Sequence, residues 1–482
     1  MKSALTVLLM LTASTAFAST SYTVRVPEDP KSVHVSGSFE ITSNTIGMYI
    51  TRSPELAGGQ ADLVRNLIVT SDGRAVAVEY IEGGDWRLDG VAEGARIEIE
   101  YDVLTEHDRY NWGPGIDEVA YRQEDGLFFT GFSLLIVSGQ NSDPPIDVRF
   151  ELPQGWHVSA PWEADATESN LYHPRSRMDL LRNCLFMGTH LEESIEMGDF
   201  TFVLAIGGDF KPHKQMFVDA MTPLLPAYVE MYGGLPEATR YLAVINPSNR
   251  SDGGAFPGSY SMLISGELNQ ASSAVWGHGI AHELMHFWNG HTLRPETPSD
   301  EEWFKEGFTD YLTIIQLSRA GLDPPEITYR KLENLARRYI VAKRLMGATD
   351  SMRAAGARKH QNRFLVYGGG ALVAFALDVR IREASGNKAG IDDLMRAMYA
   401  EFNSPEKRYT FEDIVRIAGE VSGEDQGDFF ARFVDGTEFL DVGPYFDTIG
   451  MQMATMVDEF YLSVRESATT QQRAMEGGIL GR

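Results

Sequence analysis

Two histidines stand four positions apart in the segment His282-Glu283-Leu284-Met285-His286. On an α-helix this spacing puts the imidazoles about 40° apart around the axis and roughly 6 Å apart along it, so both can reach one metal ion. Glu283 projects beside them and can take a proton from a water molecule at the metal. The motif therefore predicts a zinc hydrolase site that holds one Zn²⁺ ion.

The third metal ligand must come from elsewhere, because a catalytic zinc site uses three protein ligands and leaves one position for water. Glu306, 20 positions after His286, is the best candidate. The stretch between them contains prolines and is long enough to end one helix and begin another. Asp310 lies four positions after Glu306, on the same helix face, where its carboxylate can fix the tautomer of a ligand histidine.

Other interpretations of these residues stay open. An HExxH motif also arises by chance in an ordinary amphipathic helix, although Glu306 and Asp310 make this match more specific. His278, four positions before His282, can serve as a fourth ligand and close the site around a structural metal. Cys184 is the only cysteine, so no internal disulfide forms, and we expect it to be a small buried apolar residue.

The chain of 482 residues is too long for one core, and its length indicates roughly three domains. Residues 19–200 alternate apolar and polar side chains between short polar turns, which is typical of an antiparallel β-sandwich-like domain. Residues 322–465 carry apolar side chains at helical spacing and predict an α-helical domain. Residues 466–482 are polar and predict a flexible tail. The fold class expected is α+β, with several domains.

Residues 201–321 carry the metal-binding motif. We predict, in chain order, a buried strand at 202–206, a helix at 214–232, a buried strand at 241–245, a loop at 246–258, an edge strand at 259–265 and a motif-bearing helix at 276–288. Ser299 and Glu302 match a capping box, which predicts the start of the next helix.

The first 18 residues match a cleavable signal peptide. Lys2 precedes an apolar run at 4–13, and Ala16-Phe17-Ala18 fits a cleavage site after Ala18. We therefore expect a periplasmic or secreted protein that does not insert into a membrane after cleavage, because the apolar run is too short to span one. The net charge of -26 makes nucleic acid an unfavourable partner. The oligomeric state is not encoded in any motif.

Residues 282–289 (HELMHFWN), 293–295 (LRP) and 303–311 (WFKEGFTDY) resemble the M61 glycyl aminopeptidase family of gluzincin metallopeptidases. The resemblance implies a β-domain, a thermolysin-like catalytic domain at 201–321 and an α-helical domain. It implies zinc binding by His282, His286 and Glu306, with Glu283 as general base. It also implies that Tyr367 hydrogen-bonds the tetrahedral oxyanion, although a tyrosine packed at the start of a helix explains the same pattern.

One departure from the family concerns substrate recognition. The family's glycine-rich motif carries an acid for the substrate's amino group, whereas residues 253–258 read GGAFPG. We expect Gly253 and Gly254 to line the cleft and hold peptide backbone. The predicted function is an exported zinc metallopeptidase acting on peptides or proteins in an aminopeptidase-like way. The alternatives are a zinc endopeptidase, a non-catalytic peptide-binding relative, and a zinc hydrolase of another bond, such as an ester.

Overall fold

The computed structural model describes residues 19–48, 51–139, 145–456 and 459–481, so the expected signal peptide lies outside the described residues. The chain divides into two compact units. Unit 1 comprises Met1–Arg122, Phe129–Val158 and Trp162–Arg182, and unit 2 comprises Gln123–Phe128, Ser159–Pro161 and Asn183–Arg482. The domain boundaries predicted near residues 200 and 321 stay predictions.

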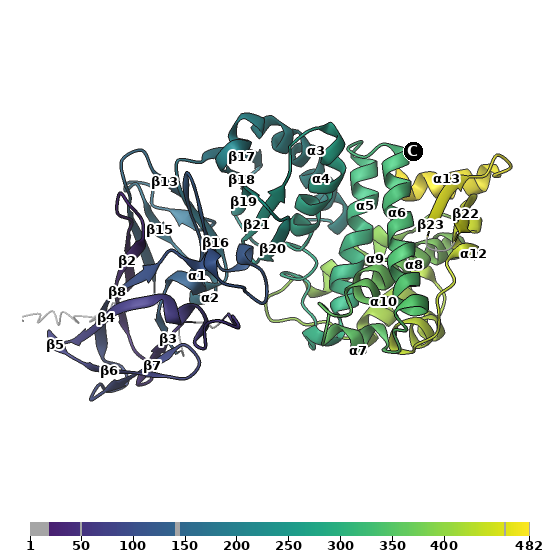
Figure 1. Ribbon diagram of the computed structural model, residues 1–482. Helices are drawn as coiled ribbons and strands as arrows, with labels where there is room; N and C mark the ends of the chain where they lie inside the picture. The colour runs from purple at the N-terminus through teal and green to yellow at the C-terminus, as the bar shows by residue number, and fades with distance from the viewer. Residues whose placement is uncertain (1–18, 49–50, 140–144, 457–458, 482) are drawn as a thin grey trace, which may run out of the picture. The chain divides into compact units, whose positions relative to one another are not determined.

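Unit 1 is built mainly from strands, as the alternating pattern predicts (Figure 1). In β8 (Arg96–Leu104), for example, Ile97, Ile99 and Tyr101 are buried and the residues between them are exposed. One sheet has the order β14-β15-β12-β1-β2-β8-β4-β5 and a second the order β11-β3-β7-β6. All the strand pairs with a described register in these sheets are antiparallel except β1 with β12.

The other strands of these two sheets are β1 (Thr20–Arg25), β2 (Ser32–Glu40), β3 (Thr45–Gly47), β4 (Val64–Ser71), β5 (Arg74–Ala75), β6 (Ala77–Ile81), β7 (Asp85–Asp89), β11 (Val137–Ser138), β12 (Ile146–Glu151), β14 (Glu163–Ala164) and β15 (Leu171–His173). The short helices are η1 (Gly59–Leu63), η2 (His107–Arg109), η3 (Ile116–Glu118), α1 (Gly131–Leu134) and α2 (Arg177–Leu181). Strands β9 (Ala120–Gln123), β10 (Gly126–Thr130) and β13 (His157–Ser159) each contain residues assigned to both units, and β16 (Cys184–Gly188) belongs to unit 2.

Unit 2 contains a five-stranded sheet in the order β17-β18-β19-β21-β20. Its strands are β17 (Leu191–Met197), β18 (Phe200–Ile206), β19 (Arg240–Ser248), β20 (Asp252–Phe256) and β21 (Ser259–Ser265). The three central strands are parallel, and β17 and β20 pair antiparallel at the two edges. The central strands are almost continuously buried, as is typical of parallel strands with both faces covered.

The prediction for residues 246–265 is wrong in two respects. β21 is an inner strand, and β20, which we expected to be a loop, is the edge strand. Glycine-rich composition conceals β20 because pairing with β21 uses backbone groups only and requires no alternation of side chains. Except for Ser265, every residue of β21 is buried, as is typical of an inner strand.

Helices α3 (Lys214–Tyr232) and α4 (Gln270–Met285) lie beside this sheet (Figure 1). The helix at 214–232 has the predicted bounds. Asn269 begins α4, where its side chain accepts hydrogen bonds from the backbone N–H groups of Ala271 and Ser272. α4 packs against β20 and β21. It carries His282, and His286 follows its last residue as the C-cap. The strands therefore fix the helix that carries the chemistry.

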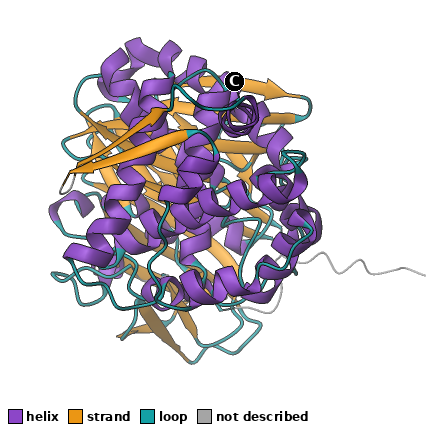
Figure 2. Ribbon diagram, turned by 90° about the vertical axis from the view of Figure 1, so that its right-hand side faces the viewer, coloured by secondary structure: helices purple, strands orange, loops and turns teal. Residues whose placement is uncertain are grey.

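Helices form most of the remaining chain, and they face the viewer in Figure 2. They are η4 (Gly208–His213), η5 (Pro298–Asp300), η6 (Trp303–Phe308), α5 (Thr309–Arg319), α6 (Pro325–Ile340), η7 (Val341–Leu345), α7 (Met352–Gly356), η8 (Phe364–Gly369), α8 (Gly370–Ser385), α9 (Ile391–Phe402), α10 (Phe411–Ser422), α11 (Gly427–Phe430), η9 (Ala431–Asp435), α12 (Gly443–Thr448) and α13 (Thr470–Leu480). Among the described helices, Phe364–Ser385 alone is long and apolar enough to cross a membrane, but it is mostly buried, like the core helix of a globular protein.

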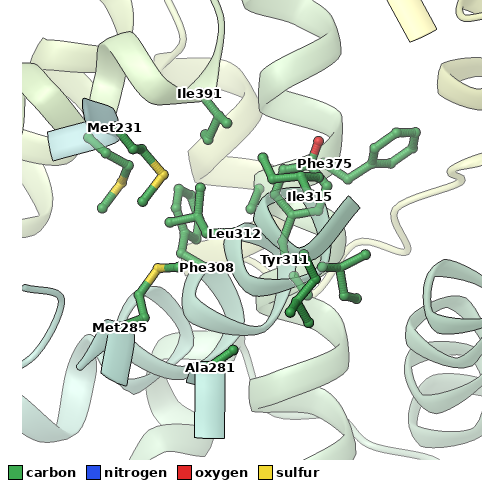
Figure 3. Close-up of a cluster of buried hydrophobic side chains, with 14 of the residues drawn as sticks. Met231, Ala281, Met285, Phe308, Tyr311, Leu312, Ile315, Phe375 and Ile391 are labelled. Carbon is green, nitrogen blue, oxygen red and sulfur yellow. The ribbon is translucent and has the colours of Figure 1, made fainter. Parts of the chain in front are cut away.

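One apolar core joins these helices to α4. Figure 3 shows Ala281 and Met285 of α4 in the same cluster as Leu312 and Ile315 of α5, Phe375 of α8 and side chains of neighbouring helices. These residues are at most 1% exposed. The segments that carry the predicted metal ligands, α4 and η6 with α5, are thus anchored in one close-packed interior. Close packing restricts the movement of their side chains.

The predicted capped helix start at Ser299 is wrong. Only the short turn η5 forms there, and the next helical segment begins at Trp303 without a side-chain cap. A capping box needs the Glu302 carboxylate to bind the backbone at Ser299. Instead, this carboxylate accepts a hydrogen bond from Lys359 at 3.0 Å.

The predicted flexible tail and the purely helical region before it are also wrong. A hairpin of β22 (Met451–Met456) and β23 (Glu459–Val464) lies in the region expected to be helical. α13 follows it, with Thr469 and Gln472 forming a capping box. The polar sequence of α13 conceals a narrow apolar stripe, in which Met475 and Ile479 are buried. This stripe ties the end of the chain to unit 2.

Candidate active site

Three donor atoms from distant parts of the sequence converge in unit 2. His282 Nε2 and His286 Nε2 are 3.1 Å apart, and Glu306 Oε2 is 3.5 Å from the first and 3.4 Å from the second. A tetrahedral zinc ion with bonds of 2.0–2.1 Å places neighbouring ligand atoms roughly 3.3 Å apart. The three residues are therefore grouped with the spacing that zinc requires, as predicted for a metal site.

The protonation of the histidines also fits a cation. His286 Nδ1 donates a hydrogen bond to the backbone carbonyl of Asn289 at 2.8 Å, and His282 Nδ1 lies 3.0 Å from Asp310 Oδ1. A neutral imidazole whose Nδ1 donates presents a lone pair at Nε2. Two lone pairs and a carboxylate oxygen thus meet in a buried space, an arrangement that only a cation stabilises.

The electrostatics of the pocket support this requirement. Burial lowers the pKa of His282, but hydrogen bonds to Asp310 and Glu306 outweigh it and raise the pKa to about 10. Burial would also raise the pKa of Asp310, yet its bonds to His278 and His282 hold it well below its usual range. The carboxylates around His282 therefore favour positive charge at this position, which is the charge that a metal ion supplies.

Glu306 is oriented by lysines on the side away from the histidines. Its Oε1 accepts a hydrogen bond from Lys359 at 2.7 Å and lies 3.2 Å from Lys305 Nζ. Burial would raise the pKa of Glu306, but the charges of Lys305, His286 and Lys359 hold it well below its usual range. The carboxylate is therefore ionised, with Oε1 engaged and Oε2 directed to the two imidazoles.

Two of these neighbours were not predicted. Lys305 is adjacent to Glu306 in the sequence, so its proximity could have been anticipated. Lys359 lies in a loop far along the chain and has no local signal. Asn289 belongs to the segment that carries the family resemblance, and with Gly290 it also predicts the end of the motif-bearing helix. Its side-chain amide donates to the carbonyls of Phe304 and Lys305, and therefore ties the end of α4 to the segment that carries Glu306.

Glu306 and Tyr367 both lie on π-helical segments, η6 and η8. Such segments are rare in proteins overall, but where they occur they often lie at functional sites. The helices cross where Gly307 meets Gly370: a Cβ on Gly307 would lie 2.5 Å from the Cα of Gly370. Only glycine allows so close a backbone approach. The crossing brings Glu306 and Tyr367 to the same site.

Glu283 lies beside the edge strand of the sheet. A Cβ on Gly253 would stand 3.0 Å from Glu283 Oε1, so β20 passes directly over this carboxylate. Burial raises the pKa of Glu283 above its usual range, and the nearby imidazoles only partly oppose this effect. The side chain remains partly exposed, as a group that exchanges protons with water must be.

The two glycines predicted to line the cleft are placed differently. Gly253 faces Glu283, whereas Gly254 faces the other side of β20, because successive strand residues point to opposite faces. Ala255 is the next residue on the side of Gly253. No acid of β20 therefore points toward Glu283.

Tyr367 packs against His282, with ring centroids 6.3 Å apart and planes inclined by 20°. Burial and the nearby carboxylates raise its pKa far above the usual value, so the phenol stays protonated and can donate a hydrogen bond. His278 does not join the three donor atoms. Its Nε2 contacts Asp310 Oδ1 at 3.2 Å, which makes it a neighbour of the carboxylate that orients His282.

Two family models match the chain. The Peptidase M61 N-terminal domain matches residues 56–189, and the M61 glycyl aminopeptidase model matches residues 278–363. The second match contains His282, His286 and Glu306. No curated protein sequence matches the chain.

Solved structures of an aminopeptidase N family protein and of an M1 zinc metallopeptidase share the fold. An aminopeptidase N family protein from Idiomarina loihiensis is 18% identical over 91% of this chain and 79% of its own, with a TM-score of 0.77. The M1 zinc metallopeptidase from Deinococcus radiodurans is 14% identical over 88% of this chain and 94% of its own, with a TM-score of 0.57. A mutant of that enzyme, bound to the substrate Tyr-Ser-Ala, has the same identity and coverage and a TM-score of 0.56. These likenesses confirm the predicted α+β multidomain fold.

Proposed function

Since this chain belongs to the M61 glycyl aminopeptidase family and is a zinc metallopeptidase, we propose that it is exported and cleaves peptides near their amino end, at the site formed by His282, His286 and Glu306. One observation carries the proposal. The three donor atoms lie 3.1–3.5 Å apart, and hydrogen bonds at Nδ1 leave both Nε2 lone pairs directed at one point.

Zinc bound at these atoms supplies Lewis acidity to the peptide carbonyl and to the attacking water. Glu283 takes the proton of that water and later delivers it to the leaving amine. Burial raises the pKa of this carboxylate, which makes it a stronger base toward that water. The Tyr367 phenol donates a hydrogen bond to the carbonyl oxygen as negative charge develops there.

β20 offers a place for the substrate backbone. It is an edge strand of the sheet, and extended peptides bind such edges through main-chain hydrogen bonds. Gly253 allows this strand to lie against Glu283 without a side chain between them. A peptide aligned along β20 would thus have its backbone next to the proposed general base.

The substitution Glu283→Gln tests the function. It removes the proton carrier and leaves the three donor atoms in place, so we expect kcat to fall at least about a thousandfold while zinc content stays at one ion per chain. Hydrolysis of a peptide mixture is followed by mass spectrometry, with zinc measured by atomic absorption. The exposed Glu296 provides the matched control, and Glu296→Gln is expected to retain activity. Unchanged hydrolysis by Glu283→Gln would refute the proposal.

A second candidate function, endopeptidase activity, is favoured by the composition of β20. The two residues that face Glu283's side of the strand are Gly253 and Ala255, so β20 supplies no carboxylate for a substrate ammonium group. Peptides with free and acetylated amino ends separate the two candidates. Loss of cleavage on acetylation supports an aminopeptidase, and equal internal cleavage of both supports an endopeptidase.

The export part of the proposal is supported by Lys2, the apolar run at 4–13 and the Ala16-Phe17-Ala18 site. Expression of the full chain in a bacterial host, followed by cell fractionation and amino-terminal sequencing, tests it. A mature protein that begins at Ser19 outside the cytoplasm is the expected result. Retention of residues 1–18 on cytoplasmic protein would contradict export.

A further inference from the structure

Four cationic side chains surround the candidate site, and one of them has no acidic partner. Lys305, Lys359 and Arg338 each form an ion pair with a carboxylate of the site. Arg363 is exposed, and among the described residues it forms no ion pair. The first three charges are therefore compensated within the protein, whereas the charge of Arg363 remains available to a ligand.

The position of Arg363 relates it to the reaction centre. Its guanidinium carbon lies 5.1 Å from the ring centroid of Tyr367, and that ring lies 6.3 Å from the ring of His282. The guanidinium is thus at most about 11 Å from the His282 ring. The guanidinium lies over the Tyr367 ring and has several N–H donors, which can bind a carboxylate in bidentate fashion.

We propose that Arg363 forms a subsite for a substrate carboxylate that lies one or two residues beyond the scissile bond, on the leaving-group side. This inference rests on the proposed peptidase function. An extended peptide spans roughly 3.3–3.6 Å per residue, and the guanidinium reaches a few ångströms further, so this distance fits one or two residues. The carboxylate is either the terminal group of a dipeptide or tripeptide, or an acidic side chain of a longer peptide.

Charge supports this direction of binding. The free ammonium group of a substrate is repelled by Arg363, so the opposite end of a short peptide is the one that fits there. The chain has a net charge of -26, which repels anionic peptides at long range. A local unpaired cation beside Tyr367 offsets that repulsion at the point where the peptide must be held.

A substrate series tests the subsite. Wild-type protein and Arg363→Gln are compared on one tripeptide with a free carboxyl end, on its carboxamide, and on a longer amidated peptide with and without glutamate at the second position after the cleaved bond. We expect amidation of the tripeptide to reduce kcat/KM by roughly 10- to 100-fold in the wild type, mainly through KM. Arg363→Gln should treat the free acid and the amide alike, and Arg363→Lys should restore part of the difference.

The two carboxylate sources give different results. A preference for the free tripeptide alone identifies the terminal carboxylate, and a preference for internal glutamate identifies a side-chain subsite; either supports the inference. Arg358→Gln is the matched control, because Arg358 lies on the same segment but is ion-paired with Asp350 at 2.9 Å. It should discriminate between acid and amide as the wild type does.

Binding measurements keep the test independent of turnover. Calorimetric titration of Glu283→Gln with the free tripeptide and its amide should show tighter binding of the free acid, and this difference should vanish in Glu283→Gln/Arg363→Gln. Hydrolysis by the wild type without any discrimination, or discrimination that persists in Arg363→Gln, would overturn the subsite and leave the peptidase function standing. Failure of the wild type to cleave any peptide would instead count against the proposed function.

Discussion

Asp310 contacts two histidines through one oxygen. Its Oδ1 lies 3.0 Å from His282 Nδ1 and 3.2 Å from His278 Nε2, and Arg338 contacts the other oxygen at 3.4 Å. A carboxylate in this position keeps the His282 proton on Nδ1, and thereby presents the Nε2 lone pair to a metal ion. The affinity of the site for zinc should therefore depend on a residue that does not touch the metal.

We predict that Asp310→Asn weakens zinc binding by roughly 10- to 100-fold, because residues that orient metal-ligating histidines have effects of this size. Competition with a chromophoric chelator measures the affinity. Asp392→Asn is the control, since Asp392 forms a partly buried pair with Arg319 at 2.6 Å and is not one of the donors. Equal zinc affinity in wild type and Asp310→Asn would show that His282 needs no carboxylate to orient it.

For individual residues, the spacing of side chains along the sequence made much of the site predictable. His282 and His286 share a helix turn, and Asp310 follows Glu306 by one turn, so these groupings need only helix geometry. Lys359 and Tyr367 reach the site through tertiary packing. Tyr367 was found by family resemblance and Lys359 was missed, because no periodicity connects them to the motif. The roles assigned to individual residues stay predictions.

Among the helices, the contact of Gly307 with Gly370 determines how Glu306 and Tyr367 meet. A Cβ on Gly307 would stand 2.5 Å from backbone atoms of Gly370, and a Cβ on Gly370 would stand 2.2 Å from the carbonyl oxygen of Trp303. Side chains can relieve such a contact by rotating, but backbone atoms cannot. A methyl group added at either glycine must therefore push η6 and α8 apart.

Gly307→Ala should therefore lower the free energy of unfolding by about 1–3 kcal/mol, the usual cost of overpacking, and weaken zinc binding as Glu306 moves. Urea denaturation and chelator competition measure the two effects. Gly277→Ala is the control on α4, because its Cβ would meet nothing within 4 Å. That substitution should stabilise the helix by up to about 1 kcal/mol and leave zinc affinity unchanged. Normal zinc affinity in Gly307→Ala would show that the contact between Gly307 and Gly370 does not position Glu306 for zinc binding.

Elements with strong apolar periodicity were predicted well, and elements stabilised by distant contacts were not. The helix at 214–232 is amphipathic along its length and has the expected bounds. β20 depends on backbone pairing with β21, and α13 depends on a narrow stripe packed on unit 2. The start of the helix near Ser299 failed because an ion pair with Lys359 removes the Glu302 carboxylate. Rules that use only residues near in sequence do not take these contacts with distant residues into account.

For the whole molecule, pH acts on stability through buried groups such as His107 of unit 1. Burial lowers the pKa of His107 to about 3, from an ordinary value of 6.5. Its ring packs against Trp112 and Phe129, with centroids 5.8 and 5.7 Å away. Below pH 6.5 the unfolded chain binds a proton at this position and the folded chain does not. Acid therefore favours unfolding, progressively from pH 6.5 down to about 3.

We predict that protonation of His107 in the unfolded chain lowers the free energy of unfolding by about 1.4 kcal/mol when the pH falls from 7.5 to 5.5. His107→Leu removes the proton site and keeps an apolar side chain, so its stability should change less over this interval, by about that amount. Urea unfolding at both pH values, followed by intrinsic fluorescence, gives the comparison. Both pH values lie above the sequence pI of about 4.8, so the protein keeps a net negative charge that maintains its solubility. An identical pH dependence in both proteins would mean that His107 is protonated when folded.

The open edge of β20 has a consequence for self-association. An unpaired edge strand offers its backbone to any extended chain, including the same strand of another copy, and natural proteins usually guard such edges with lysine, proline or bulges. β20 has the sequence DGGAF and carries none of these within its five residues. The edge that would admit a peptide is thus also open to misassembly. Crowding should promote pairing of copies through β20, and bound peptide should protect against it.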